Sequence, residues 1–261
     1  MKTKSIKCSE LEKYLENLLN VKTFNDYCPN GLQIEGKKII SKIAFSVSCE
    51  LSTIENAIDN KVDAIIVHHG LFWHHHGAKA LTGVFGKKIK LLMQNNINLF
   101  AYHLPLDAHL SLGNAAFIGK LVNLTDIQPF GEYKKMPLGI KGKFSKKTNI
   151  DQLRDVISEK LDHAIIHARP ENKELVKSMA IITGGANNEW IQAAREKIDV
   201  YLTGEISEYN YFDAIENNLH FLACGHYATE KGGISNLRNN ISQKFQLNSA
   251  QTILINSHNP V

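Results

Sequence analysis

The chain has 261 residues, of which 43% are hydrophobic and 21% are charged. This composition excludes a disordered chain, and the length is sufficient for two hydrophobic cores. No apolar run approaches the length of a bilayer span, so we expect no membrane partner. A formal net charge of +4 is compatible with nucleic-acid binding but is too small to indicate it.

The N-terminus and the cysteines indicate a cytoplasmic protein. Residues 1–6 are basic, but no apolar segment that could act as a signal peptide follows them. The cysteines have neither a paired nor a Cys-x-x-Cys spacing, which is typical of reduced, buried thiols. They are Cys8, Cys28, Cys49 and Cys224.

The first half of the chain alternates segments typical of helices and of strands. The pattern Ser9-x-x-Glu12, followed by leucines on one face, predicts a capped amphipathic helix. In order, we expect a helix over 9–19, a turn at 29–31, a strand over 39–47, a helix through 55–58, a strand over 63–69, a helix over 86–95, a strand over 97–102 and a helix over 114–124. Such alternation predicts a mostly parallel sheet covered on both faces.

The second half repeats part of the first. Ile43–Gly70 aligns with Met179–Ile206 without a gap, at an offset of 136 residues (179 − 43), so that Asp63 falls on Asp199. A second piece, 95–101, aligns with 217–223 at an offset of 122 residues (217 − 95). Because both pieces keep their order and end strands at the same places, we infer a duplicated β-α-β unit.

The repeat predicts an α/β protein made of two domains or two interleaved halves, with mostly parallel or mixed sheets. The first half would span residues 1–128 and the second residues 129–261. A connecting β segment is expected over 129–148 and a helix over 149–161, and the C-terminal segment is expected to pack back on the first half. If the halves face one another across a pseudo-twofold axis, their strand ends converge on one cleft.

Three motifs at predicted strand ends carry side chains that bind metals. Val67-His68-His69-Gly70 closes one strand, and His103-x-x-x-Asp107 and His226-x-x-x-Glu230 follow two others. The mixed nitrogen and oxygen donors suit zinc, iron, manganese or nickel. Five ligands are too many for one tetrahedral site, so we expect two divalent ions per subunit. The predicted ligands are His68, His69, Asp107, His226 and Glu230.

The remaining histidines have weaker assignments. His103 is a metal ligand, a partner that orients a ligand, or a general acid, and we favour a catalytic role that does not involve binding the metal. The run His74-His75-His76 cannot all face one ion and is expected to form a mobile rim. Gly184-Gly185 lacks a full phosphate-loop pattern and predicts only a tight turn.

A group of lysines lies between the halves. Because lysines commonly protect the edges of sheets from pairing, we interpret the group as a solvated edge strand with its loops. The alternative is a surface that binds nucleic acid. The group comprises Lys134, Lys135, Lys141, Lys143, Lys146 and Lys147.

Five motifs occur in a fixed order along the chain, at 26–33, 67–70, 103–107 with Gly113-Asn114, 203–205 and 225–230. Together they resemble the GTP cyclohydrolase 1 type 2 homologue family, also called the NIF-three-like family. The resemblance runs from about Glu10 to the C-terminus. It implies two intertwined α/β domains that arose by duplication.

The resemblance also implies a toroidal homohexamer with a dinuclear metal site on the inner side of the ring. Carried over by motif, His68 and Asp107 would hold one ion, His69 and His226 the other, and Glu230 would bridge both. The family name implies opening of the GTP ring by attack at C8 of the purine.

The leading functional hypothesis is a dinuclear metal-dependent hydrolase or cyclohydrolase that acts on a nucleotide-like or other small polar substrate. The alternatives are a non-catalytic metal-binding protein, a ring that encloses nucleic acid, and an interaction scaffold with a vestigial site.

Overall fold

A computed structural model of the protein describes residues 4–261 and divides them into two compact units. The first unit contains the chain up to Leu106 together with Ile234–His258. The second unit contains Asp107–Gly233 and Asn259–Val261. The boundary between residues 128 and 129 that the repeat predicts stays a prediction, because it divides repeated units and not compact units.

The first unit is built on a five-stranded sheet with the strand order β13-β4-β5-β6-β2. Strands β4, β5, β6 and β13 are parallel, and β2 pairs antiparallel with β6. A separate antiparallel pair consists of β1 (Ile6–Lys7) and β3 (Ile39–Ile40). The strands of the main sheet are β2 (Gly31–Ile34), β4 (Ile43–Ser48), β5 (Ala64–His69), β6 (Asn98–Ala101) and β13 (Thr252–Leu254).

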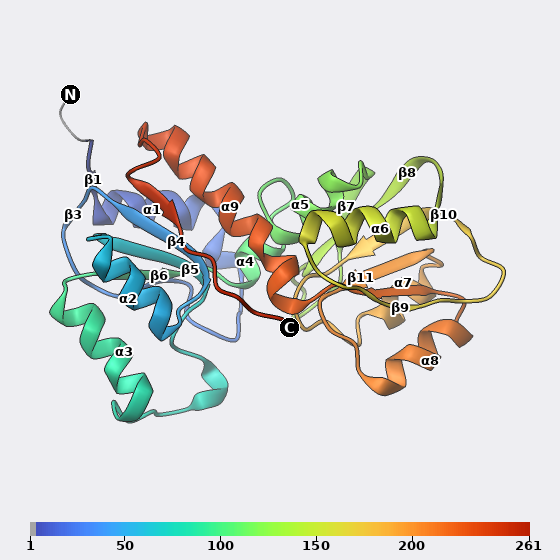
Figure 1. The fold of residues 1–261 in the computed structure, drawn as a ribbon, viewed down its shortest axis with the longest axis horizontal. Coiled ribbons are helices and arrows are strands. Elements are labelled where there is room, and N and C mark those ends of the chain that lie inside the picture. Colours follow the sequence, from blue (N-terminus) through green and yellow to red (C-terminus); the bar gives the residue numbers. More distant parts are fainter. Residues whose placement is uncertain (1–3) are drawn as a thin grey trace. The chain divides into compact units, whose positions relative to one another are not determined.

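Helices cover both faces of this sheet (Figure 1). Helices α1 and α9 pack with Phe45, Ile66 and Phe100 in one core, whereas α2 and α3 pack with Ile65 and Leu99 in another. Successive strand residues thus point to opposite cores, as the period of two requires. The helices and short 3-10 turns here are α1 (Cys8–Leu18), η1 (Val21–Thr23), α2 (Leu51–Asp59), η2 (His74–His76), α3 (Gly83–Gln94) and α4 (Leu104–Asp107), and α9 (His226–Phe245) begins in the second unit.

The second unit has a six-stranded sheet with the order β7-β8-β10-β11-β12-β9, in which β10, β11 and β12 are parallel. Helices α5 and α6 line its larger core, and α7 and α8 cover the opposite face (Figure 1). Its strands are β7 (Thr125–Phe130), β8 (Gly139–Asn149), β9 (Ile166–Ala168), β10 (Leu175–Ile181), β11 (Val200–Thr203) and β12 (His220–Ala223). Its helices are α5 (Asn114–Leu121), α6 (Ile150–Leu161), α7 (Trp190–Arg195) and α8 (Glu208–Glu216).

The strand registers confirm the duplicated β-α-β unit. Ile43 pairs with Ala64 between β4 and β5, and Met179 pairs with Val200 between β10 and β11, which is the same pair displaced by 136 residues (179 − 43 and 200 − 64). The next strand is displaced by 122 residues, because Ala64 pairs with Asn98 and Val200 with His220 (220 − 98). The fold class expected from the sequence is therefore correct.

An aspartate fixes the start of each repeat in the same way. Asp63 Oδ2 accepts hydrogen bonds from the backbone N–H groups of Ser41 and Lys42. In the second repeat Asp199 Oδ2 accepts from the N–H groups of Lys177 and Ser178 at 2.8 and 3.0 Å. Each carboxylate also pairs with a lysine, in one case Lys37 and in the other Lys173.

Two local expectations were wrong. The predicted capping box does not form, because α1 begins at Cys8 after Lys7, which makes no side-chain cap bond, and Ser9 lies inside the helix. The lysine-rich segment 141–147 is not an edge strand, because β8 lies between β7 and β10 in the sheet.

The four cysteines are buried, and burial raises the pKa of Cys49 to about 12. Over residues 4–261, none of the helices combines the length and the apolar character that a bilayer crossing requires.

The aspartates of the repeat give a first test. Burial alone would raise the pKa of Asp199, but the Lys177 N–H and the charge of Lys173 outweigh this and hold the pKa below 3.8. Asp199→Ala should therefore lower the free energy of unfolding by roughly 1–3 kcal/mol at pH 7. The stabilisation is fully present above pH 3.8 and is lost as the pH falls through the lower pKa of the folded state.

Urea unfolding at pH 7 and at about pH 2, below the ordinary aspartate pKa, measures this difference. Asp213→Ala on the exposed face of α8 is the matched control. Equal stability of the two variants at pH 7 would contradict the role of Asp199.

Candidate metal centre

The carboxyl ends of β5 and β6 bring three histidines together in the first unit. His68 and His69 are the last residues of β5, and His103 follows β6 after one intervening residue. The three side chains offer ligand atoms that all lie within 4.8 Å of one another and could hold a metal ion. The imidazole of His68 is fully buried, whereas those of His69 and His103 are partly exposed.

Hydrogen bonds set the orientation of the two β5 histidines. His68 Nδ1 lies 2.9 Å from the backbone carbonyl oxygen of Tyr102. Because a carbonyl only accepts, Nδ1 carries the proton and Nε2 carries the lone pair that a metal requires. His69 Nδ1 lies 3.1 Å from Ser48 Oγ, which the pairing of β4 with β5 brings alongside.

Asp26 orients His103 and is saturated by donors. Its Oδ1 accepts from the Tyr27 N–H at 2.6 Å and from His103 Nδ1 at 2.8 Å. Its Oδ2 accepts from Asn30 Nδ2 at 2.8 Å and from the Leu104 N–H at 2.9 Å. Four bonds use the lone-pair sites of a carboxylate, so Asp26 positions His103 and is not available as a metal ligand.

The electrostatics of Asp26 agree with this role. Burial would raise the pKa of its carboxyl group, but the hydrogen bond and charge of His103, together with the donors from Asn30 and Leu104, hold that pKa below its ordinary value. The carboxylate therefore stays ionised and accepts a hydrogen bond from the Nδ1–H group of His103.

In the second unit, the first turn of α9 carries His226 and Glu230. His226 Nε2 lies 3.3 Å from Glu230 Oε1, and His226 Nδ1 lies 2.5 Å from Glu205 Oε1. Burial lowers the pKa of His226, but the two carboxylates outweigh it and raise that pKa to about 9. An imidazole held between two carboxylates has one nitrogen oriented by Glu205 and the other directed at Glu230.

Asp107 is held close to the Glu230 carboxylate. Its Oδ1 accepts from Asn114 Nδ2 at 2.8 Å and from Thr183 Oγ1 at 2.9 Å. The carboxylate oxygens of Asp107 and Glu230 come within 4.8 Å of one another, and both side chains are buried, with 6% and 2% exposed. Two buried carboxylates at this distance repel unless a cation or a proton lies between them.

Gly184 lets the backbone pass close to the side chains of the second pair of ligands. It follows β10 with a φ of +69°, and a Cβ at this position would clash with Glu230 Oε1 and lie 3.1 Å from His226 Nε2. The neighbouring Gly185 has no such constraint, because its Cβ would lie 3.6 Å from the Glu205 carboxylate. The imidazole and carboxylate donors that meet beside Gly184 suit a divalent cation of the zinc, iron, manganese or nickel type.

The predicted site residues thus gather in two sets, with His68, His69 and His103 in the first unit and Asp107, His226 and Glu230 in the second. The run His74-His75-His76 forms η2, is exposed and does not join the group of three histidines. The sequence analysis assigned no role to the side chains that orient the ligands. These are Asp26, Ser48, Asn114, Thr183 and Glu205.

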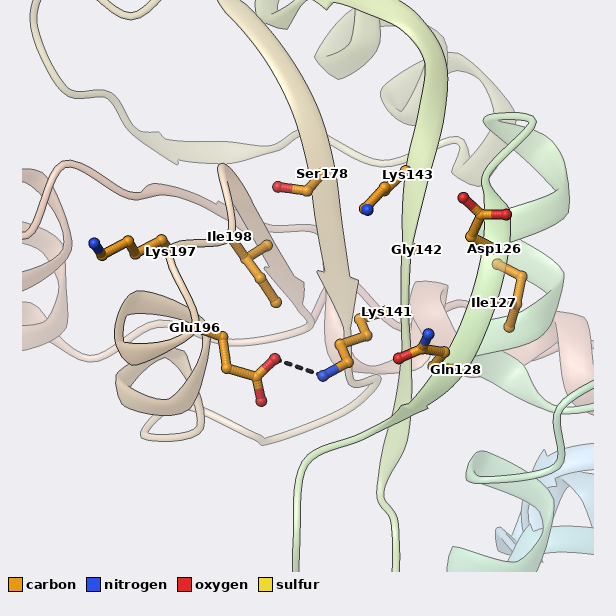
Figure 2. Close-up of a pocket in the computed structure, with 10 residues that line it drawn as sticks. All are labelled: Asp126, Ile127, Gln128, Lys141, Gly142, Lys143, Ser178, Glu196, Lys197 and Ile198. Carbon is orange, nitrogen blue, oxygen red and sulfur yellow. Dashed lines mark hydrogen bonds and ion pairs between the residues drawn. The ribbon is translucent and has the colours of Figure 1, made fainter.

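The predicted lysine group contributes to a hollow elsewhere in the second unit (Figure 2). This hollow of about 600 Å³ is lined by Lys141, Lys143 and Lys197 but also by Asp126 and Glu196. Lys141 Nζ lies 2.6 Å from Glu196 Oε2, which neutralises part of the positive charge. None of the predicted metal ligands lines it.

Sequence comparison finds close relatives over nearly the whole chain. The chain is 38% identical over 238 residues to a GTP cyclohydrolase 1 type 2 homolog of Pasteurella multocida, with 91% of this chain and 94% of the relative covered. It is 39% identical over 255 residues to a protein of the same name from Chlamydia pneumoniae, with coverage of 97% and 98%.

Solved structures and a family description agree with these relatives. The structure of protein ybgI, described as of unknown function, superimposes with a TM-score of 0.90 at 35% identity and covers 98% of this chain and 100% of its own. A model of the Duf34/NIF3 family (NGG1p interacting factor 3) matches residues 6–260. The chain belongs to the Duf34/NIF3 family.

Proposed function

We propose that this protein is a dinuclear metal-dependent hydrolase or cyclohydrolase that acts on a nucleotide-like small molecule. The observation that carries the proposal is the set of imidazoles and carboxylates whose orientation is fixed by hydrogen bonds at the ends of parallel strands. The name of the relatives, GTP cyclohydrolase 1 type 2 homolog, supports GTP as the first substrate to test.

In this proposal His68 and Asp107 hold one ion, His69 and His226 hold the other, and Glu230 bridges both. The distance of 3.3 Å between His226 Nε2 and Glu230 Oε1 supports a shared ion for that pair. The proximity of the Asp107 and Glu230 oxygens supports a bridging role for Glu230. The proposal requires the histidines of the first unit and the side chains of the second to bind the same pair of ions.

A bound pair of divalent ions would act as a Lewis acid and lower the pKa of water. The chain's own residues orient the reaction around them. Asp26 Oδ1 accepts a hydrogen bond from His103 Nδ1 at 2.8 Å, so that a protonated His103 presents Nε2–H to a substrate. We assign to His103 the transfer of a proton to the leaving group, and to Asp26 the positioning of His103. Glu205 holds the His226 ring through Nδ1.

A protein that only stores or carries metal would need the same ligands but would not need the pair formed by Asp26 and His103. This pair therefore favours catalysis over the non-catalytic alternative.

We also propose that the protein forms a toroidal homohexamer and lies in the cytoplasm, as expected from the sequence analysis. The scattered spacing of the four buried cysteines supports a reducing compartment.

Metal content tests the ligand set. Metal-loaded protein should hold two divalent ions per chain by elemental analysis, and His68→Ala and Glu230→Gln should each lose at least one ion together with GTP turnover. The matched controls are His258→Ala and Glu216→Gln, which change exposed residues of the same types. Turnover and full metal content in both site variants would contradict the proposal.

Gly184 gives a steric test of the same site. Gly184→Ala should reduce metal content, because the added methyl group would occupy the space beside Glu230 Oε1 and His226 Nε2. Gly83→Ala is the control for backbone strain, because Gly83 also has a positive φ, +57°, but has nothing within 4 Å of its Cβ. Gly185→Ala is the second control, because it adds a methyl group to the neighbouring residue, where a Cβ would make only an ordinary contact with Glu205. Equal metal binding by all three variants would mean that this space holds no ion.

His103 should separate catalysis from metal binding. His103→Gln is expected to keep both ions and to lower kcat by roughly 100-fold or more, because a general acid typically contributes that much. Asp26→Asn should have a smaller effect in the same direction. Elemental analysis beside steady-state kinetics checks this, and a simultaneous loss of metal in His103→Gln would identify His103 as a ligand instead.

A further inference from the structure

A hollow of about 380 Å³ opens beside His69 within the first unit. Its volume falls in the range of small-molecule sites. Residues from four segments line it: the end of β4, the end of β5, the loop that follows β5, and the first turns of α3. A proposed metal ligand, His69, therefore forms part of the wall of this hollow.

Aromatic rings form the apolar part of the hollow. The Trp73 ring lies 5.8 Å from the His69 ring, measured between centroids, and both residues line the hollow together with Phe85. Trp73 is partly exposed, whereas the Lys79 ammonium group lies over the ring of Phe85. Flat aromatic faces of this kind stack on nucleobases regardless of the base.

Two lysines supply positive charge to the hollow. Lys79 Nζ lies 4.3 Å from the centroid of the Phe85 ring. Lys88 Nζ donates to the backbone carbonyl of Cys49 at 2.8 Å, which fixes the ammonium group at the wall of the hollow. An ammonium group has three donors, and the carbonyl uses one of them. One acidic residue, Glu50, also lines the hollow and leaves the charged side chains with an excess of one positive charge.

We propose that this hollow is the binding site for a nucleoside polyphosphate, with the base against Trp73 near His69 and the phosphates at Lys79 and Lys88. The inference rests on the proposed function, because it names the site for the substrate of that reaction. The ring contact between Trp73 and the proposed metal ligand His69 supports this placement of the base.

Trp73 supplies a direct binding signal that needs neither metal nor turnover. The other tryptophan, Trp190, is 6% exposed and lies in the second unit, so its emission should stay constant. We expect GTP to quench the fluorescence of metal-free protein in EDTA in a saturable manner, and Trp73→Phe to abolish the change. Guanosine and inorganic triphosphate should each bind at least about tenfold more weakly than GTP, because each makes only part of the contacts.

Lys88→Gln and Lys79→Gln test the phosphate contacts. Each should weaken GTP binding by about tenfold and leave guanosine binding unchanged, because a hydrogen bond to a charged group is lost. Lys87→Gln is the matched control, since Lys87 lies on the same helix but outside the hollow and pairs with Glu55 at 3.4 Å.

Three results would overturn the inference: no quenching by GTP, equal affinity for GTP and guanosine, or equal effects of Lys88→Gln and Lys87→Gln. Because these measurements use metal-free protein, they are independent of catalysis. GTP turnover by metal-loaded protein without a Trp73 response would leave the proposed function intact and remove this site. Binding at Trp73 without turnover would support this binding site and contradict the proposed function.

Discussion

The candidate metal centre depends on parallel strand pairing that brings the carboxyl ends of β5 and β6 to one edge of a sheet. The pairing brings the Tyr102 carbonyl within 2.9 Å of His68 Nδ1, and that hydrogen bond selects which nitrogen of the buried imidazole is available. The same strand pair, displaced along the chain, recurs in the second unit and leads into His226 and Glu230. A duplicated backbone has therefore acquired different side chains at equivalent strand ends.

Much of this architecture could be predicted from the sequence because its signals are local. The apolar run before His68 predicts a buried strand, and the fixed offset between Asp63 and Asp199 predicts a repeat that the strand registers confirm. Both aspartates also make the same backbone contacts, so the repeat extends to hydrogen bonding. The position of the histidines at strand ends followed from the length of each apolar run.

Other features depend on contacts that no local pattern encodes. Strand β2 begins at Gly31, inside a turn signal, because pairing with β6 overrides the local preference. Asp26 meets His103 only in the folded chain, 77 residues apart, and a sequence cannot report which donors saturate a carboxylate. The need for a residue without a side chain at Gly184 likewise appears only when His226 and Glu230 pack against it. Helix α9 belongs to both compact units, so the repeat could not give the boundary between them.

We propose that side chains of both units share one pair of cations. Anomalous X-ray diffraction from crystals of metal-loaded protein, recorded at the absorption edge of the bound metal, tests it most directly. The account predicts two anomalous peaks per chain, about 3.5 to 4 Å apart, each coordinated by a histidine from the first unit and a side chain from the second, with Glu230 touching both. A single peak, or peaks coordinated by residues of one unit alone, would contradict it.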